Sequence, residues 1–509
     1  MVRLIGFVLI ALSPVLSGSI DAVLAAGRGE SATPVRERLV FGLSGDPDTL
    51  DPHGTTGTLT FQTMRSVYDT LVEPDRDGEI VPALAESWEV HDEGLRWVFH
   101  LRSGVVFHHG RRLSAEDVRA TLERLRDPDF ASPSAHEYSA IEAINTPDDS
   151  TVELVLSEPY APLLATLASG WSAILPADLL EQNHDFGSRP VGTGPFRFER
   201  WVRDSEILLT RNSDYWQQGL PYLEEVQFRI ITEQAVLAQA LLAGRIDVAD
   251  IVVEPELSML QAADNVKLYE STSALVMVLA MNTRRSPLDD LDVRRGINAA
   301  IDKQAIMDTA YAGGEVVGTF MDVSNPYYVD FTDLHPYDPD FARQVAGKIE
   351  GTRELVISLP QNFEPHVRAG EMYHEMLRNA GFRVRTQLVD WSTWLSDVYR
   401  GGQFDLTVIG HTGKLDPHGR LAQFGTADTY VGWVDTPTAE AIDAARVEQD
   451  PEIRRELYTI ALRRMAEQLP FVFVGSPYSY VGLNADLTGF YMDSQLDTAD
   501  LRSVRFESR

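Results

Sequence analysis

Apolar residues alternate with mostly polar ones along two stretches of the chain. From Leu95 to Leu101 every second side chain is apolar, and the same period returns from Val152 to Leu156. An alternating pattern is typical of a strand that buries only one of its faces. A turn at residues 147–150 precedes the second stretch, so the sequence predicts two half-buried strands in this part of the chain.

A third stretch repeats with the spacing of a helix. Ser114 and Asp117 have the spacing of a capping box, in which each residue satisfies a backbone N–H of the other. Val118, Leu122 and Leu125 then fall on one helical face. The sequence therefore predicts a helix that begins after Ser114 and packs through this apolar face.

The spacing of apolar residues and the signals for helix ends predict two further helices. Residues 233–243 are good helix formers, and Gly244 stands where helices commonly end. Apolar residues four apart from Val293 to Ile301 predict an amphipathic helix, with Arg294 and the arginine after it facing solvent. Because strands and helices alternate irregularly, the pattern favours an α/β or α+β protein over a helical bundle.

The composition bounds the class of protein. The chain has 509 residues, of which 44% are apolar, and its formal net charge is −32. This length allows about three ordinary domains. Phosphate binding requires clustered Lys and Arg, so the acidity argues against nucleic acid or anionic lipid as a partner. The charge is typical of a soluble, self-repelling surface; the alternative is a field that gathers cationic ligands.

The N-terminus and the absence of cysteine indicate export. An apolar stretch from Leu4 to Leu16 follows Arg3, and small residues around Ala25 supply a cleavage site, so residues 1–26 are predicted to be a signal peptide. The apolar stretch is short for a membrane span. The lack of cysteine excludes disulfides, thiolate metal sites and a lipidated N-terminal cysteine. We therefore expect a free periplasmic protein of a Gram-negative cell.

The sequence contains no complete catalytic motif. His136–Glu137 and His374–Glu375 begin like a zinc-protease motif, but Ala140 and Arg378 stand where the second histidine is required. A P-loop, a dinucleotide fingerprint and a Gly-x-Ser-x-Gly elbow are also lacking. Because catalytic triads are assembled in space, a secreted metal-dependent hydrolase stays open as an alternative.

A long succession of short motifs runs through the chain, and its order and spacing carry the information. The motifs are Leu50–His53, Tyr68–Val72, Gly78–Trp88, Trp97–Gly110 and Leu113–Val118, then Val191–Phe196, Arg211–Trp216, Pro221–Val226, Met281–Thr283 and Val293–Lys303. Taken in this order, they closely resemble the family 5 extracellular solute-binding proteins. These are peptide- and nickel-type receptors that deliver ligands to ABC importers.

This resemblance implies an α/β fold of the type II periplasmic-binding-protein kind, in its large cluster C form. Such a fold has two lobes, a hinge and an interlobe cleft. The apolar stretches Ala274–Met281 and Phe471–Gly475 are the expected crossovers between the lobes. The expected bounds are 36–270 plus 481–509 for lobe I, with an insertion subdomain at about 66–190, and 271–480 for lobe II.

The loop from Gly410 to Arg420, dense in glycine and polar groups, is the first candidate for the ligand site. In the family the corresponding loop lines the cleft. In peptide receptors it carries, four residues before its proline, an aspartate that pairs with the peptide's amino terminus. Gly413 occupies that position here, which weakens the case for a peptide. Asp416 either accepts a cation in its place or caps the following turn. The candidate residues of the loop are His411, Lys414, Asp416 and His418.

The same loop also resembles that of the nickel receptors, through the triplet Asp416–His418. His411 and His418, together with His53 from another loop, would contribute imidazoles to a nickel complex. The arginine for which nickel receptors are known is not evident near His136, so this second analogy is also incomplete.

Three aromatic residues complete the candidate site, and core packing is the alternative for each of them. They are Trp394, Tyr430 and Trp433. Of these, Trp433 stands in the most polar surroundings, which favours a place facing the cleft.

The leading hypothesis is a periplasmic receptor for peptides or peptide-like solutes that hands its ligand to an ABC permease in the inner membrane. Lobe closure would trap the ligand without a covalent step, and we expect a monomer with no cofactor and no resident metal. The alternatives are a nickel or metallophore receptor of the same family, the hydrolase considered above, and a chaperone-like peptide binder.

Overall fold

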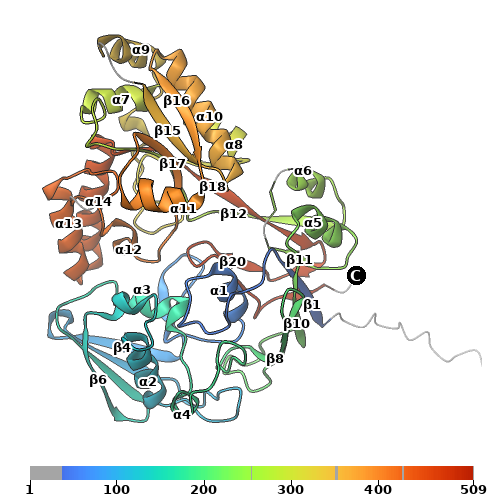
Figure 1. Cartoon of the computed structure of the whole chain (residues 1–509). Coiled ribbons are helices and arrows are strands. Elements are labelled where there is room, and N and C mark those ends of the chain that lie inside the picture. The colour runs from blue at the N-terminus through green and yellow to red at the C-terminus, as the bar shows by residue number, and fades with distance from the viewer. Residues whose placement is uncertain (1–36, 251, 254, 350–353, 427–428, 508–509) are drawn as a thin grey trace, which may run out of the picture.

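The computed structural model describes residues 37–250, 252–253, 255–349, 354–426 and 429–507, and these form two bodies (Figure 1). The predicted signal peptide, residues 1–26, lies outside the described residues. Lobe I holds three apolar cores whose buried members come from residues 39–266 and 480–506. Lobe II holds two cores whose buried members come from residues 276–474. No helix among the described residues is long and apolar enough to cross a membrane.

One long strand, β18 (Phe471–Asn484), belongs to both lobes. Its first half pairs antiparallel with β13 (Val276–Met281) in lobe II, and its second half pairs with β12 (Val266–Thr272) beside lobe I. Figure 1 shows β12 and β18 running from one body to the other. The chain therefore passes between the lobes twice, between β12 and β13 and again within β18.

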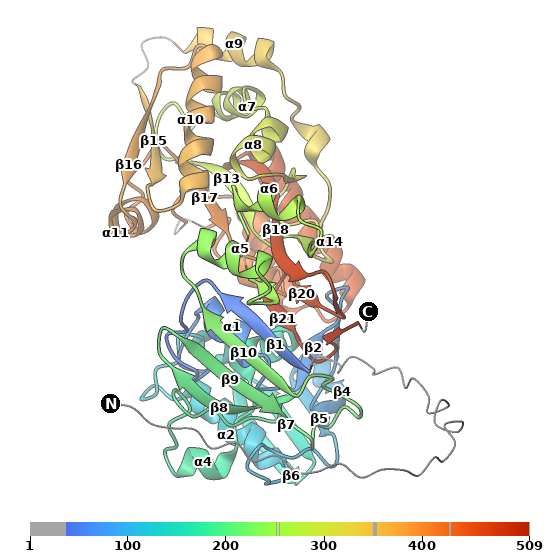
Figure 2. The same cartoon turned by 90° about the vertical axis from the view of Figure 1, so that its right-hand side faces the viewer.

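The sheet of lobe I continues outward from β18 and mixes parallel and antiparallel pairs (Figure 2). Its strands after β18 are β11 (Val248–Ala249), β1 (Arg38–Leu43), β10 (Glu225–Ile230), β9 (Glu206–Arg211) and β8 (Phe196–Val202). Three two-stranded sheets lie apart from it: β2 (Val72–Pro74) with β3 (Ile80–Pro82), β19 (Leu487–Thr488) with β22 (Arg505–Phe506), and β20 (Tyr491–Asp493) with β21 (Thr498–Asp500).

A separate antiparallel sheet within lobe I contains the two strands predicted from alternation. Its order is β4 (Ala85–His91), β5 (Arg96–Leu101), β7 (Thr151–Leu156) and β6 (Ile141–Asp148). In β5 the side chains of Trp97, Phe99 and Leu101 are buried while those between them are partly exposed, as predicted. The lobe I helices are α1 (Thr58–Met64), α2 (Ala115–Arg126), α3 (Leu163–Ala168), α4 (Ala177–Glu181), α5 (Gln234–Leu242) and α6 (Glu256–Gln261).

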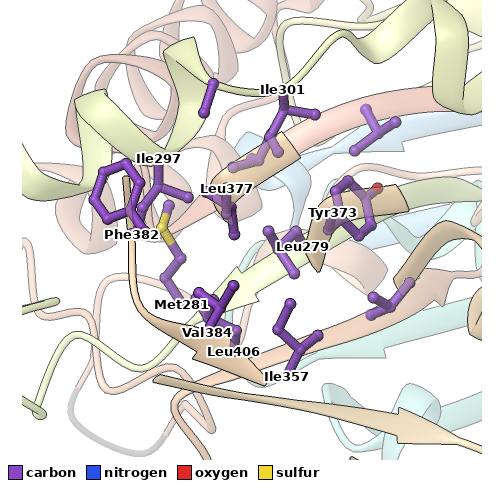
Figure 3. Close-up of a cluster of buried hydrophobic side chains, with 14 of the residues drawn as sticks. Leu279, Met281, Ile297, Ile301, Ile357, Tyr373, Leu377, Phe382, Val384 and Leu406 are labelled. Carbon is purple, nitrogen blue, oxygen red and sulfur yellow. The ribbon is translucent and has the colours of Figure 1, made fainter. Parts of the chain in front are cut away.

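Lobe II is a sheet covered on both faces. Its order is β16 (Val384–Val389), β15 (Leu355–Pro360), β17 (Leu406–His411), β13 and β18, with β14 (Gly314–Val316) paired to β18. Every residue of β13 is buried, because alternate side chains enter the two different cores. Figure 3 shows one core, where Leu279 and Met281 meet Tyr373, Leu377 and Leu406. This double burial explains why β13 reads as a continuous apolar run.

The lobe II helices lie on both sides of this sheet (Figures 1 and 2). They are α7 (Leu291–Ala299), α8 (Lys303–Ala310), α9 (Pro339–Lys348), α10 (Glu364–Asn379), α11 (Trp391–Thr393), the π-helical turn η5 (Trp394–Arg400), α12 (His418–Leu421), α13 (Thr436–Val447) and α14 (Pro451–Gln468).

Two local predictions are confirmed and one is wrong. The capping box at Ser114 and Asp117 begins α2, and Gly244 follows α5 with a positive φ of 63°. Arg294, predicted to face solvent, is buried. Its guanidinium donates to the backbone oxygens of Gln468, 2.9–3.0 Å away, and Leu288, 2.8 Å away. The arginine thus satisfies one carbonyl at the end of α14 and one before the start of α7, which helical periodicity alone does not reveal.

Candidate functional site

A cavity of about 430 Å³ lies where the two lobes face each other. Lobe I supplies one wall from α1, from the segment around Trp171 and from the C-terminal tail. The crossover at Ser271–Leu275 supplies another part, and lobe II contributes Thr412–Leu415. The volume lies within the range of about 300–1,000 Å³ that is usual for small-molecule sites. A ligand here touches both lobes and the crossover between them.

Trp171 forms an aromatic wall that meets lobe II. The Lys414 ammonium nitrogen lies 4.9 Å from the centre of the Trp171 ring, which is cation–π distance. Phe61 packs edge-on against the same indole with ring centres 6.1 Å apart. An added Cβ at Gly170 would come within 2.8 Å of the Phe61 ring, so a glycine is needed for this packing. The indole N–H is buried and has no hydrogen-bond partner within the described chain.

Most of the charged groups that line the cavity are neutralised within lobe I. Arg502 contacts Asp500 at 2.7 Å and Glu73 at 3.0 Å. Arg65 donates to the hydroxyl of Thr498 at 2.7 Å. These contacts fix the tail of the chain against α1 and leave little net charge in this part of the wall.

Asp69 is held by three donors. The hydroxyl of Thr193 donates at 2.8 Å, the indole N–H of Trp216 at 3.1 Å and the hydroxyl of Tyr215 at 3.2 Å. Burial raises the pKa of this carboxyl, although the hydrogen bonds oppose the shift. Because all three donors belong to lobe I, the Asp69 carboxylate is used within this lobe, and Asp69 acts as a structural part of the cavity wall.

Asp497 differs from the other acids of the lining. It lies in the turn between β20 and β21, and within the described residues no hydrogen bond or ion pair holds its carboxylate. Although the side chain of Asp497 is exposed, partial loss of hydration in the cavity raises its pKa, and the neighbouring Asp493 raises it further. A cationic group placed in the cavity would offset both effects.

Of the eight predicted site residues, Lys414 lines this cavity and the other seven do not. His411 points into lobe II, where its Nε2 lies 2.8 Å from the hydroxyl of Tyr430. Burial lowers the pKa of His411 to about 3. Tyr430 itself is buried and stacks on the imidazole, with ring centres 5.9 Å apart. This pair therefore supports the end of β17 from behind the cavity.

Asp416 and His418 also serve lobe II. The Asp416 carboxylate lies 2.7 Å from the Arg454 guanidinium, and both side chains are buried. The backbone N–H of His418 donates to Asp416 at 2.8 Å, which is the capping contact that was one alternative for this aspartate. The imidazole of His418 meets the ring of Tyr160 edge-on. Its position marks a contact between the lobes.

The remaining predicted residues are packed inside the lobes. His53 lies in lobe I, where its Nε2 is 2.9 Å from the Ala173 oxygen and its Nδ1 is 3.0 Å from Arg124; burial lowers its pKa to about 4. Trp394 is buried and donates to the Thr407 hydroxyl at 2.9 Å. Trp433 is buried in a lobe II core. Since they and the four side chains above are used internally, we leave these seven residues out of the proposed site.

The three histidines considered for nickel have separate partners. Among the described residues, no group of three or more histidine, aspartate or glutamate side chains is gathered as a metal site. Two residues that line the cavity and that sequence reasoning did not name are Trp171 and Asp497. Neither stands in a motif, and only the fold brings these two distant segments to one cavity.

The chain belongs to the bacterial extracellular solute-binding proteins, family 5, whose model matches residues 79–430. It is 30% identical to the di/tripeptide-binding protein 3 of Pseudomonas aeruginosa, over 92% of this chain and 95% of that protein. The structure of HbpA2 from Haemophilus parasuis is similar, with a TM-score of 0.84 and 25% identity over 92% of this chain and 100% of the other. DppA from Helicobacter pylori, solved with the peptide STSA, has a TM-score of 0.75 and 27% identity over 93% and 98%.

Proposed function

We propose that this protein is the ligand-capturing component of an ABC importer and that it binds short peptides or peptide-like solutes. The observation that carries the proposal is the cavity itself, which is built from both lobes and from the crossover between them. A ligand that contacts both lobes favours the closed arrangement over an open one. The similarity to a di/tripeptide-binding protein supports peptides as the ligand class.

The lobes move as two bodies in this proposal. We assign residues 36–270 plus 481–509 to lobe I, with an insertion subdomain at about 66–190, and residues 271–480 to lobe II. The hinge lies at the two crossovers, between β12 and β13 and within β18. Release to an inner-membrane permease follows when the lobes open, and the ligand leaves unchanged because the protein acts by binding and not by catalysis.

We also propose that residues 1–26 direct export and that the mature protein is a periplasmic monomer. N-terminal sequencing of protein from the periplasmic fraction is expected to start close to Gly27. An intact Met1 terminus on protein bound to the membrane would contradict this assignment.

A thermal-shift screen tests the ligand class. Ligands that bind only the folded protein raise its melting temperature, and the stabilisation grows with the logarithm of the ligand concentration over Kd. The panel consists of di- and tripeptides, nickel with histidine, opines and oligosaccharides. We expect the peptides to raise the melting temperature; a shift given by nickel with histidine and by no peptide would overturn the proposal. Mass spectrometry of co-purified small molecules gives an independent answer.

A further inference from the structure

The charges that line the cavity are not all paired. Three of its four carboxylates have partners within lobe I: Asp69 has its three donors, and Asp500 and Glu73 share Arg502. Asp497 is the exception in the described part of the chain. The Asp497 side chain is exposed to the open cavity, so its carboxylate is hydrated there, and a ligand that displaces this water must supply a partner in its place. The cavity therefore presents one acid that a bound cation would satisfy.

Two backbone hydrogen bonds to Asp493 shape the turn that carries Asp497. The carboxylate of Asp493 accepts the backbone N–H groups of Gln495 and Leu496 at 3.0 and 2.9 Å. Asp497 itself has a φ of +53°, in the left-handed region that aspartate and asparagine tolerate better than most residues. A preorganised turn of this kind places the carboxylate without a large loss of entropy on binding.

The lobe II loop opposite this turn has a glycine, Gly413, at the point of closest approach, and the absence of a side chain there makes room for the C-terminal tail. An added Cβ at Gly413 would lie 2.2 Å from the Ala274 Cβ and 3.1 Å from the Gln495 side-chain oxygen. The Gln495 amide instead reaches across to lobe II, donating to Asp322 and to Ser324, both at 2.9 Å. The turn thus touches both lobes, and a side chain at position 413 has no room there.

A cation without an acidic partner lies on the lobe II side of the same cavity. Lys414 contacts the Trp171 ring, and no carboxylate in the described ranges lies within ion-pair distance of its ammonium group. Asp497 and Lys414 therefore do not neutralise each other across the cavity. One exposed acid and one half-buried base, neither with an opposite charge beside it in the described part of the chain, match a ligand that carries both a cation and an anion.

We propose that Asp497 binds the free amino end of the ligand and that Lys414, on the Trp171 wall, binds its free carboxylate. This assignment rests on the proposed function and narrows it to unblocked, zwitterionic peptides or peptide-like solutes. It also gives the ligand a direction, with its amino end toward the C-terminal tail of lobe I.

Isothermal titration calorimetry with Ala-Phe, N-acetyl-Ala-Phe and Ala-Phe amide tests both contacts. Since a hydrogen-bonded charge contact contributes strongly to binding, Asp497→Asn is expected to weaken Ala-Phe binding by about 10- to 100-fold. Asparagine keeps the left-handed turn and nearly the same shape, which protects the fold. The acetylated peptide is expected to bind the wild-type protein equally weakly and to lose nothing further in the variant.

The matched control is Asp204→Asn. Asp204 also has a positive φ, of 57°, and lies in the exposed turn between β8 and β9, away from the cavity. Its replacement is expected to leave Ala-Phe affinity within about twofold of wild type. If Asp497→Asn binds as the control does, or if N-acetylation has no effect on the wild-type protein, the assignment is overturned while peptide binding stands. If the wild-type protein binds neither Ala-Phe nor Ala-Ala-Phe, the proposed function itself fails.

Discussion

The lobe II loop at residues 410–420 and the lobe I turn at residues 494–497 face the same cavity with opposite uses of their polar groups. The loop is the richer of the two in histidine and charge, yet His411 and Asp416 turn inward to Tyr430 and Arg454. The turn carries fewer polar groups, and its Asp497 carboxylate has no partner within the described chain. Most polar groups of the loop thus hold the loop in place, whereas the turn leaves one carboxylate without an internal partner, and we propose that a ligand uses it.

The largest expected effect is on protein stability and tests whether Asp416 of the loop has a structural role. Asp416→Ala leaves the buried Arg454 guanidinium without its carboxylate, which typically costs about 3–5 kcal/mol. We expect urea unfolding to show a loss of this size while a ligand still binds at temperatures where the variant is folded. Asp443→Ala, on the exposed face of α13, is the matched control and is expected to stay within about 0.5 kcal/mol of wild type. Unchanged stability with lost binding would return Asp416 to the site.

The next effect concerns the pH dependence of stability at His411. Its folded pKa of about 3 lies below that of an unfolded histidine, so its contribution is complete above pH 6.5 and is lost as the pH falls toward 3. One such group costs about 3 kcal/mol by pH 4.5. His411→Gln is therefore expected to flatten the measured fall in unfolding free energy between these pH values. The exposed His136→Gln serves as the control, and an identical slope for both variants would refute a buried neutral imidazole.

Lys414→Gln tests whether the ammonium group of Lys414 binds the carboxylate of the ligand. Loss of the ammonium group is expected to weaken the binding of Ala-Phe by about tenfold, within the range for a partly exposed charged contact. Ala-Phe amide has no carboxylate to lose, so its affinity is expected to change little. Calorimetry of both peptides measures the difference. An equal loss for both would show that Lys414 acts through the shape of the wall and not through its charge.

The smallest effect concerns a contact between the lobes away from the cavity. Arg446 of α13 holds Glu158 of lobe I through two contacts of 2.8 and 3.2 Å. An exposed ion pair contributes about 0–1 kcal/mol and weakens in salt. Arg446→Gln is expected to lower peptide affinity by less than about fivefold, with no difference left in 1 M salt. A tenfold or larger loss at both salt concentrations would make this pair a major support of the closed arrangement.

Alternation, helical spacing and caps predicted strands such as β5 and helices such as α2, because these patterns report local burial. The same reasoning failed at Arg294, whose partner carbonyl lies 174 positions away along the chain. For a similar reason, sequence reasoning did not foresee which of the candidate side chains line the cavity. Whether Asp416 is free depends on Arg454, and whether Asp497 is free depends on every element packed around the tail. The loop that the resemblance pointed to contributes to the cavity wall, but Lys414 is the one of its four candidates that lines the cavity.

A crystal structure of the protein with Ala-Phe tests the central claim most directly. We predict that the peptide occupies the cavity between the lobes, with its ammonium group within hydrogen-bond distance of the Asp497 carboxylate and its own carboxylate beside Lys414 and Trp171. A peptide bound in the reverse direction would contradict the assignment of the two ends. Density for the peptide anywhere outside the interlobe cavity would contradict the account as a whole.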